Sequence, residues 1–248
     1  MFPIRDHNPS GRTAYVTIAL VAINILVFLG YFLSKNDYQL NGFFGTWGLV
    51  PARIMAGEGL ETLVTSMFLH GGWGHLAGNM LFLWIFGDNL EEEMGHVGFL
   101  VFYLAAGLAA GVAQIAADTG SPVPMVGASG AIAGVMGGYL LLFPRAKVDV
   151  LFIFLVFFRI FAIPAWIVLG IWFTLQLVSG FSTPGVGGGV AYWAHAGGFL
   201  GGLVLTLPVW LRRGAKAFWQ ATAGHPPHPE TRFQAARSNV PLIRRRPL

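Results

Sequence analysis

The sequence predicts an all-α membrane protein, a bundle of six transmembrane helices with a large, membrane-embedded first loop. Hydrophobic residues make up 55% of the 248-residue chain and charged residues only 10%, against roughly 25% charged residues in an average soluble domain. The few charges leave long stretches without Asp, Glu, Lys or Arg, the longest of which runs from Ile160 to Leu211. Because about 20 apolar residues cross a bilayer core, these stretches exclude a water-soluble fold.

Six spans fit the apolar stretches. They are expected at residues 13–33, 75–89, 96–117, 128–143, 162–179 and 192–211. The first stretch is longer than the apolar core of a signal peptide, and no small-residue cleavage site follows it, so we expect a retained helix. The second span begins at the polar His75 and is short. The acidic run from Asp88 to Glu93 is expected to form a solvated turn between the second and third spans.

The chain between the first two spans is expected to form the large loop. Within residues 34–74, glycines and Pro51 interrupt an aromatic-rich sequence that is too broken for a span and too apolar for a free linker. We therefore expect this loop to lie in the membrane interface. A further apolar stretch, residues 148–160, contains Asp149 and Arg159. It is expected to be either a re-entrant segment or the start of a longer helix.

The basic residues predict the orientation, because Lys and Arg favour the cytoplasmic side of a membrane. With the N-terminus inside, Lys35 and Arg53 fall outside, Arg159 is ambiguous, and all other basic residues fall inside. Both termini are therefore expected in the cytoplasm. The chain then divides into a cytoplasmic N-terminal segment (1–12), a six-helix membrane domain (13–213) and a basic, disordered cytoplasmic tail (214–248).

The net charge of +4 does not indicate a nucleic-acid partner. The basic residues lie outside the apolar stretches and mostly at the chain ends, where lipid headgroups and topology account for them. The chain has no cysteine, so disulfides, zinc–thiolate sites and thiol nucleophiles are excluded. We expect a multi-pass protein of a prokaryotic plasma membrane, in contact with the lipid bilayer.

Polar side chains inside the predicted spans are the candidates for function, because they are costly in a bilayer. His75 and Asn79 open the second span, Ser129 opens the fourth, and His195 opens the sixth. Under the predicted orientation, each lies within about two helical turns of the outer end of its span. Three separate stretches thus bring polar side chains to one depth on one side of the membrane.

Ser129 and His195 are predicted to act together. Small residues flank Ser129, and among them Gly127 supports the site by leaving the hydroxyl accessible. A serine is a weak nucleophile without a base within hydrogen-bond reach, and His195 is the histidine placed to act as that base. Glycine spacing on the fourth and sixth spans lets the two helices pack backbone to backbone. These glycines are Gly130, Gly134 and Gly138 on the fourth span, and Gly197, Gly198, Gly201 and Gly202 on the sixth.

No carboxylate lies in the fourth or sixth span, so the predicted unit is a Ser-His dyad and not a triad. His75 and Asn79, four residues apart, share one helix face. Both can donate to a developing oxyanion, together with the backbone N–H of Ser129. A metal site of His70, His75 and His195 is disfavoured, because no carboxylate accompanies them. We expect neither a metal nor a cofactor.

These residues make the chain similar to the rhomboid family of intramembrane serine proteases. Three motifs carry the resemblance, which covers residues 13–211: HGGWGHLAGN (70–79), GASG (127–130) and AHAGG (194–198). It implies that Ser129 is the nucleophile and His195 the general base. It also implies that His75 and Asn79 are the oxyanion donors, and that His70, which matches the family's loop histidine, has a more structural role.

The resemblance also implies a substrate class. The family cleaves transmembrane segments of other membrane proteins near the outer face, preferring small residues at the cut and helix-destabilising residues beyond it. Family members often carry a tyrosine four residues after the serine, stacked on the histidine, where this chain has Ala133. Tyr139, Tyr192 and Trp193 are the candidates to pack there, whereas Trp172 is expected to be a packing or lipid-facing residue.

Two other classes of function are to be weighed against the protease. A non-catalytic rhomboid-like protein would bind transmembrane helices without cutting them, but such proteins typically lack the serine or the histidine. A small-solute channel or transporter would require ionisable groups to continue across the midplane. The polar residues of this chain cluster near one face instead.

Overall fold

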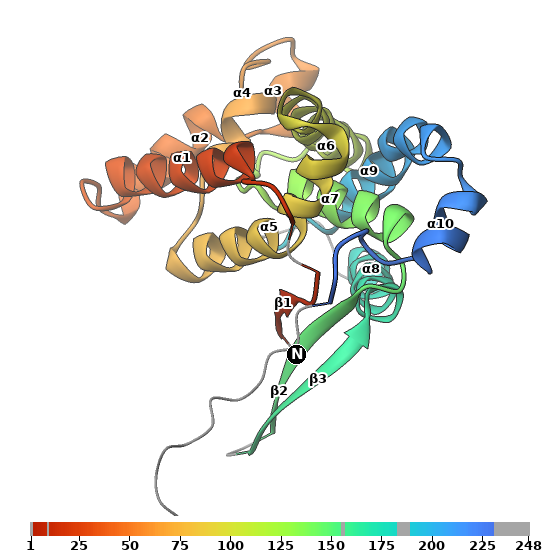
Figure 1. The fold of residues 1–248 in the computed structure, drawn as a ribbon. Coiled ribbons are helices and arrows are strands. Elements are labelled where there is room, and N and C mark those ends of the chain that lie inside the picture. Colours follow the sequence, from red (N-terminus) through yellow and green to blue (C-terminus); the bar gives the residue numbers. More distant parts are fainter. Residues whose placement is uncertain (1, 9, 155–156, 183–188, 231–248) are drawn as a thin grey trace, which may run out of the picture.

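Helices make up most of the structure, and a three-stranded sheet lies at one end of the bundle (Figure 1). The computed structural model describes residues 2–8, 10–154, 157–182 and 189–230. In chain order the elements are β1 (Phe2–Asp6), α1 (Tyr15–Phe32), α2 (Asp37–Trp47), α3 (Pro51–Met55), α4 (Thr62–Thr65), the 3-10 helix η1 (Ser66–Phe68), α5 (Trp73–Met94), α6 (His96–Ala117), α7 (Ser129–Leu142), β2 (Lys147–Phe154), β3 (Phe157–Pro164), α8 (Ala165–Ser182), α9 (Tyr192–Arg212) and α10 (Lys216–Thr222).

Each of the six stretches that the sequence predicts to cross the membrane contains a helix. Four of these helices, α1, α6, α8 and α9, are long and apolar enough to span a bilayer. α5 has 22 residues but ends in an acidic run, and α7 has only 14 residues. That α5 and α7 also cross the membrane stays a prediction.

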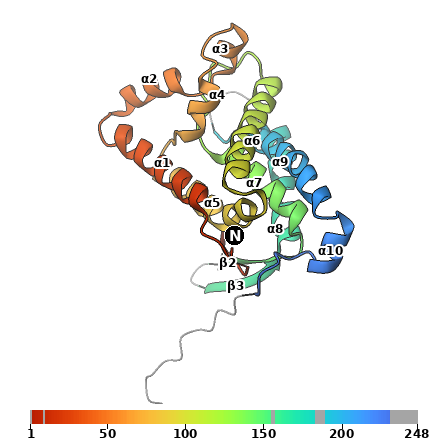
Figure 2. The ribbon, with the colours of Figure 1, turned by 45° about the horizontal axis from the view of Figure 1, so that its top comes forward.

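α7 lies between α5, α6 and α9 (Figure 2), and nearly all of its residues are buried. Glycines allow this close packing. Gly198 and Gly202 of α9 lie against the backbone of Gly130 and Gly134 of α7, so that a Cβ at either α9 position would overlap α7. The two helices therefore meet backbone to backbone, as the glycine spacing predicts. The other two glycines of the α9 pattern face α6.

The segment between α1 and α5 contains three short helices and η1, and is more regular than the irregular loop that the sequence predicts. An antiparallel bridge between Leu49 and Met125 joins it to the chain before α7. The N–H of Gly127 donates to the carbonyl of Ser66 at 2.9 Å. The segment is thus attached to the residues that lead into α7, while its place in the membrane interface stays a prediction.

The prediction that residues 148–160 begin a longer helix was wrong, whereas their re-entry into the membrane stays a prediction. Residues 148–154 and 157–160 lie in the antiparallel strands β2 and β3, which set Lys147 opposite Pro164, and β1 adds a third strand beside β2. β-Branched and aromatic residues, which dominate this stretch, favour strands. Asp149 is not a break in a helix: its carboxylate accepts a hydrogen bond from Arg5 of β1 at 2.7 Å.

The first part of the expected disordered tail is also ordered. Residues 216–222 form α10, where Phe218 is 8% exposed and packs on Phe143, and the indole of Trp219 donates to the carbonyl of Leu141 at 2.9 Å. Two aromatic residues give this segment enough apolar surface to dock on the bundle. Residues 231–248 of the expected tail lie outside the described residues.

The acidic end of α5 is not the solvated turn that the sequence predicts, because it continues the helix and anchors the N-terminal part of the chain. Glu91 is 1% exposed. Its carboxylate accepts the backbone N–H groups of Val16 and Thr17, each at 2.8 Å, and the Thr17 hydroxyl at 2.7 Å. These bonds satisfy donors at the start of α1 that have no partner within the helix. They therefore hold α1 and α5 together.

Asp6 of β1 is buried at the same end of the bundle. Its carboxylate accepts hydrogen bonds from Asn89 Nδ2 at 2.8 Å and from the Tyr139 hydroxyl at 3.1 Å. Burial, together with the nearby charge of Asp88, raises the pKa of Asp6 to about 7. Folding therefore favours the protonated acid.

Replacing Gly202 with Ala should lower the thermal unfolding midpoint in detergent by on the order of 5 °C, because the added methyl group forces α7 and α9 apart. The matched control is Gly170→Ala on α8, where nothing lies within 4 Å of the added Cβ. An equal midpoint for the two variants would contradict backbone-to-backbone packing of α7 and α9.

The stability of the protein should fall between about pH 4 and pH 7, because over this range folded Asp6 holds a proton that the unfolded chain releases. Asp6→Asn keeps both accepted hydrogen bonds and removes the titration. Thermal unfolding measured from pH 4 to pH 8 should give a flatter profile for this variant and a higher midpoint than the parent above pH 7. Glu58→Gln, at an exposed acid, should leave the parental profile unchanged.

Candidate active site

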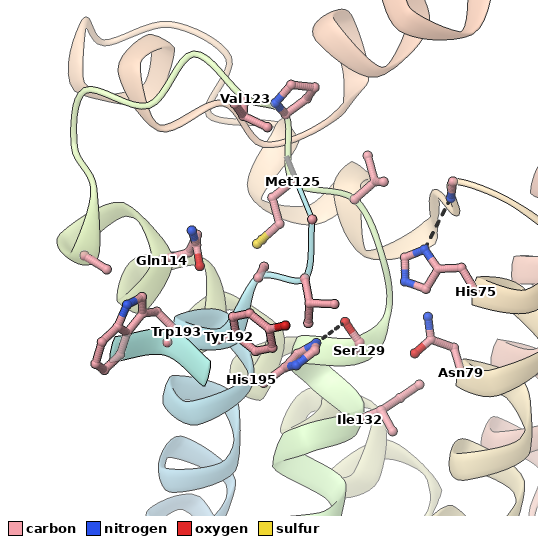
Figure 3. A pocket seen from close by; sticks show the side chains of 18 of the residues that line it. His75, Asn79, Gln114, Val123, Met125, Ser129, Ile132, Tyr192, Trp193 and His195 are labelled. Atoms are coloured by element: carbon pink, nitrogen blue, oxygen red, sulfur yellow. Dashed lines mark hydrogen bonds between the residues drawn. The ribbon is translucent and has the colours of Figure 1, made fainter. Parts of the chain in front are cut away.

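The starts of three helices bring the predicted polar residues to one place. His75 and Asn79 lie in the first two turns of α5, Ser129 is the first residue of α7, and His195 lies in the first turn of α9. All four line one cavity of about 920 Å³. Figure 3 shows Ser129 between His195 on one side and the His75 and Asn79 pair on the other.

Ser129 and His195 are hydrogen-bonded, with the serine Oγ 2.7 Å from Nε2 of the imidazole (Figure 3). The predicted contact between these two side chains is therefore present. The second ring nitrogen, Nδ1, lies 2.8 Å from Oε1 of Gln176 on α8. A serine hydroxyl that shares its proton with a histidine nitrogen can act as a nucleophile toward a carbonyl carbon.

His75 directs a donor toward the same part of the cavity. Its Nδ1 accepts the N–H of Gly71 at 3.3 Å, so the proton of the neutral ring is on Nε2. That Nε2 lies close to Gly127, where a Cβ would be only 2.8 Å from it. Gly127 also has φ +134°, a conformation that other residues rarely adopt. Glycine at this position therefore allows the ring to approach the chain that leads into Ser129.

Asn79 supplies a second donor. Its side chain is 7% exposed, and within the described residues its Nδ2 atom is buried without a hydrogen-bond partner. A buried amide N–H without a partner is uncommon and costs free energy. The cavity around Ser129 thus contains donor capacity that the protein itself does not use.

His70 does not line the cavity. It is fully buried behind His75, with the two ring centroids 5.1 Å apart. The hydroxyl of Tyr31 donates to the His70 carbonyl and accepts its N–H, each at 2.7 Å, and so ties this loop to α1. Burial and the proximity of His75 lower the pKa of His70 to about 3, so the ring is neutral. In the described ranges, no three His, Cys, Asp or Glu side chains are grouped as a metal site requires.

The aromatic residue that packs on His195 is Trp172 of α8, with ring centroids 5.7 Å apart and a 37° angle between the planes. None of the three residues considered from the sequence takes this place. Tyr139 bonds Asp6 at the opposite end of α7, Trp193 packs on Phe181, and Tyr192 lines the cavity without a ring contact to His195 in the described structure. The sequence did contain a signal for a polar contact on this helix. Gln176 follows Trp172 by four residues, so the two side chains share one face of the predicted fifth span.

Comparison with known proteins gives an independent result. A model of the Rhomboid domain matches residues 57–212. The chain is 37% identical over 125 residues to rhomboid protease GluP of Bacillus subtilis, 33% over 119 residues to the chloroplastic rhomboid-like protein 11 of Arabidopsis thaliana, and 31% over 144 residues to the mitochondrial rhomboid protein 1 of Saccharomyces cerevisiae. These matches cover 50%, 45% and 55% of this chain but only 24%, 38% and 38% of the relatives. The chain thus matches well under half the length of these relatives.

Proposed function

The chain belongs to the rhomboid family, and from this premise we propose that it is an intramembrane serine endopeptidase with Ser129 as nucleophile and His195 as general base. The observation that carries the proposal is the 2.7 Å contact between Ser129 Oγ and His195 Nε2 at a cavity between apolar helices. Serine and histidine in this relation are the minimum for nucleophilic acyl transfer.

In the proposed reaction, Ser129 Oγ attacks the scissile carbonyl carbon while its proton passes to His195 Nε2. The carbonyl oxygen becomes an oxyanion in a tetrahedral intermediate. When the intermediate collapses, the C–N bond breaks and His195 gives its proton to the leaving amine. A water molecule, deprotonated by His195, then hydrolyses the acyl-enzyme and restores the Ser129 hydroxyl.

Two side-chain donors support an oxyanion site in this proposal. The Nε2–H of His75 faces the cavity beside Ser129, and so does Nδ2 of Asn79, which has no hydrogen-bond partner among the described residues (Figure 3). The backbone N–H of Ser129, at the start of α7, is not used within its helix. We propose that these three groups stabilise the developing charge, and Gly127 keeps the space between them open.

The proposed substrates are transmembrane segments of other membrane proteins, which enter from the side and unwind locally at the cavity. The helices α1, α5, α6, α7, α8 and α9 would all cross the membrane, with both termini in the cytoplasm and the cavity near the outer face. α8 fits lateral entry, because only 11% of it is buried within the protein. The expected prokaryotic plasma membrane is not supported by the comparisons, since relatives from mitochondria and chloroplasts match alongside a bacterial one.

Replacing Ser129 with Ala should abolish cleavage of a reporter transmembrane substrate in liposomes, a loss on the order of 10⁶ if serine and histidine act as a unit. The parent should also be labelled by a fluorophosphonate, from which Ser129 Oγ displaces fluoride, and the variant should not. Ser34→Ala, at an exposed serine outside the cavity, is the control and should behave as the parent. Labelling or cleavage that persists in Ser129→Ala would end the serine-protease proposal.

Replacing Asn79 or His75 with Ala should lower kcat by about 10²- to 10³-fold each and leave KM nearly unchanged, because the lost hydrogen bond forms only in the transition state. Trp84→Phe on the exposed side of α5 controls for changes to the helix itself. Cleavage kinetics of the reporter in liposomes give both constants. Parental kcat in folded Asn79→Ala protein would exclude Asn79 from the oxyanion site.

A further inference from the structure

Both ring nitrogens of His195 are hydrogen-bonded, each to a side chain from a different helix. Nε2 lies 2.7 Å from Ser129 Oγ of α7, and Nδ1 lies 2.8 Å from Oε1 of Gln176 of α8. We propose that Gln176 is a positioning residue, which holds His195 in the one tautomer that can take the Ser129 proton. This proposal rests on the proposed function and assigns a role to a residue outside the predicted site.

The orientation of the Gln176 amide follows from its second contact. Its Nε2 lies 3.5 Å from the carbonyl oxygen of Trp172, one turn earlier on α8. A carbonyl can only accept a hydrogen bond, so the NH₂ group of the amide faces it and the amide oxygen faces His195. The helix itself thus decides which end of the glutamine points at the imidazole.

The tautomer of His195 follows in turn. The amide oxygen of Gln176 has no proton to give, so Nδ1 of His195 must carry the hydrogen in this bond. A neutral imidazole has one N–H, which leaves Nε2 with a free lone pair. That lone pair faces Ser129 Oγ and is the acceptor that a general base needs.

Gln176 is the acceptor that the structure offers to this nitrogen. In the described part of the chain, no carboxylate is hydrogen-bonded to His195. A neutral amide orients the ring without placing a charge among apolar helices, where an ionised carboxylate would be costly. Trp172, from the same helix, packs against the imidazole and limits its rotation.

Packing of α8 alone does not account for this geometry. Gln176 is half-buried, and it is not among the residues that line the cavity, so a direct contact with substrate is not expected. An apolar side chain of the same length would pack equally well in a mostly apolar helix. The polar end of Gln176 is therefore explained by its bond to His195.

The test compares two replacements of similar length at one position. Gln176→Met removes the acceptor and should lower kcat by about 10- to 100-fold with little change in KM. Gln176→Glu keeps an oxygen acceptor, as carboxylate or as carboxylic acid, and should retain kcat within about tenfold of the parent. Thr174→Val, at an exposed residue on the same helix, should match the parent. Equal kcat values for the Met and Glu variants would overturn the proposal.

A second measurement does not depend on activity. In ¹⁵N-histidine-labelled protein, the His195 resonances, assigned by their loss in His195→Ala, should report Nδ1–H and unprotonated Nε2 in the parent and in Gln176→Glu. In Gln176→Met they should shift toward a mixture of the two tautomers. If the parent shows this tautomer but cleaves no substrate, the proposed function fails while the Gln176 bond stands. If the Met variant keeps the parental tautomer, the positioning role fails whatever the activity.

Discussion

The contact between α7 and α9 is the constraint on which the site depends. Ser129 and His195 lie on different helices, and their side chains are short, so their 2.7 Å separation requires the two backbones to come unusually close. Gly198 permits this by lying against Gly130, the residue that follows the serine. In a membrane, where lipid competes equally well for apolar side chains, small residues are what allow such an approach. The same glycines that build the core therefore set the geometry of the reacting atoms.

α5 connects this site to the opposite end of the bundle. Its first turns carry His75 and Asn79, while its last turns carry Glu91 and Asn89, which bind the start of α1 and the buried Asp6. The far end of the helix is thus held by polar groups that apolar surroundings make costly to leave unpaired. The proposed oxyanion donors lie on a helix that is fixed at its far end through the hydrogen bonds of Glu91 and Asn89.

α8 differs from α7 and α9 in how little of it is buried. Only Ala165 and Leu169 of this helix are fully buried, yet it supplies both Trp172 and Gln176 to His195. The proposed base is consequently held by contacts that require α8 to be seated on α9. Under the proposed function, a helix that a substrate segment would have to pass also holds the imidazole in place. The orientation proposed for His195 therefore depends on the position of α8, through direct contact.

The sequence by itself determined the apolar helices, the four polar residues at their starts and the glycine spacing that joins α7 to α9, because each depends on residue type and periodicity within one stretch. It predicted neither the β2–β3 hairpin nor the docking of α10, since an apolar stretch fits several structures until its neighbours are known. It also missed the Trp172 and Gln176 contacts to His195, and it suggested Tyr139, which lies at the wrong end of α7. Only the tertiary structure decided these points. Which side chain faces the imidazole depends on how α8 is rotated and placed against α9, and the spacing of Trp172 and Gln176 indicates only that the two share a helix face.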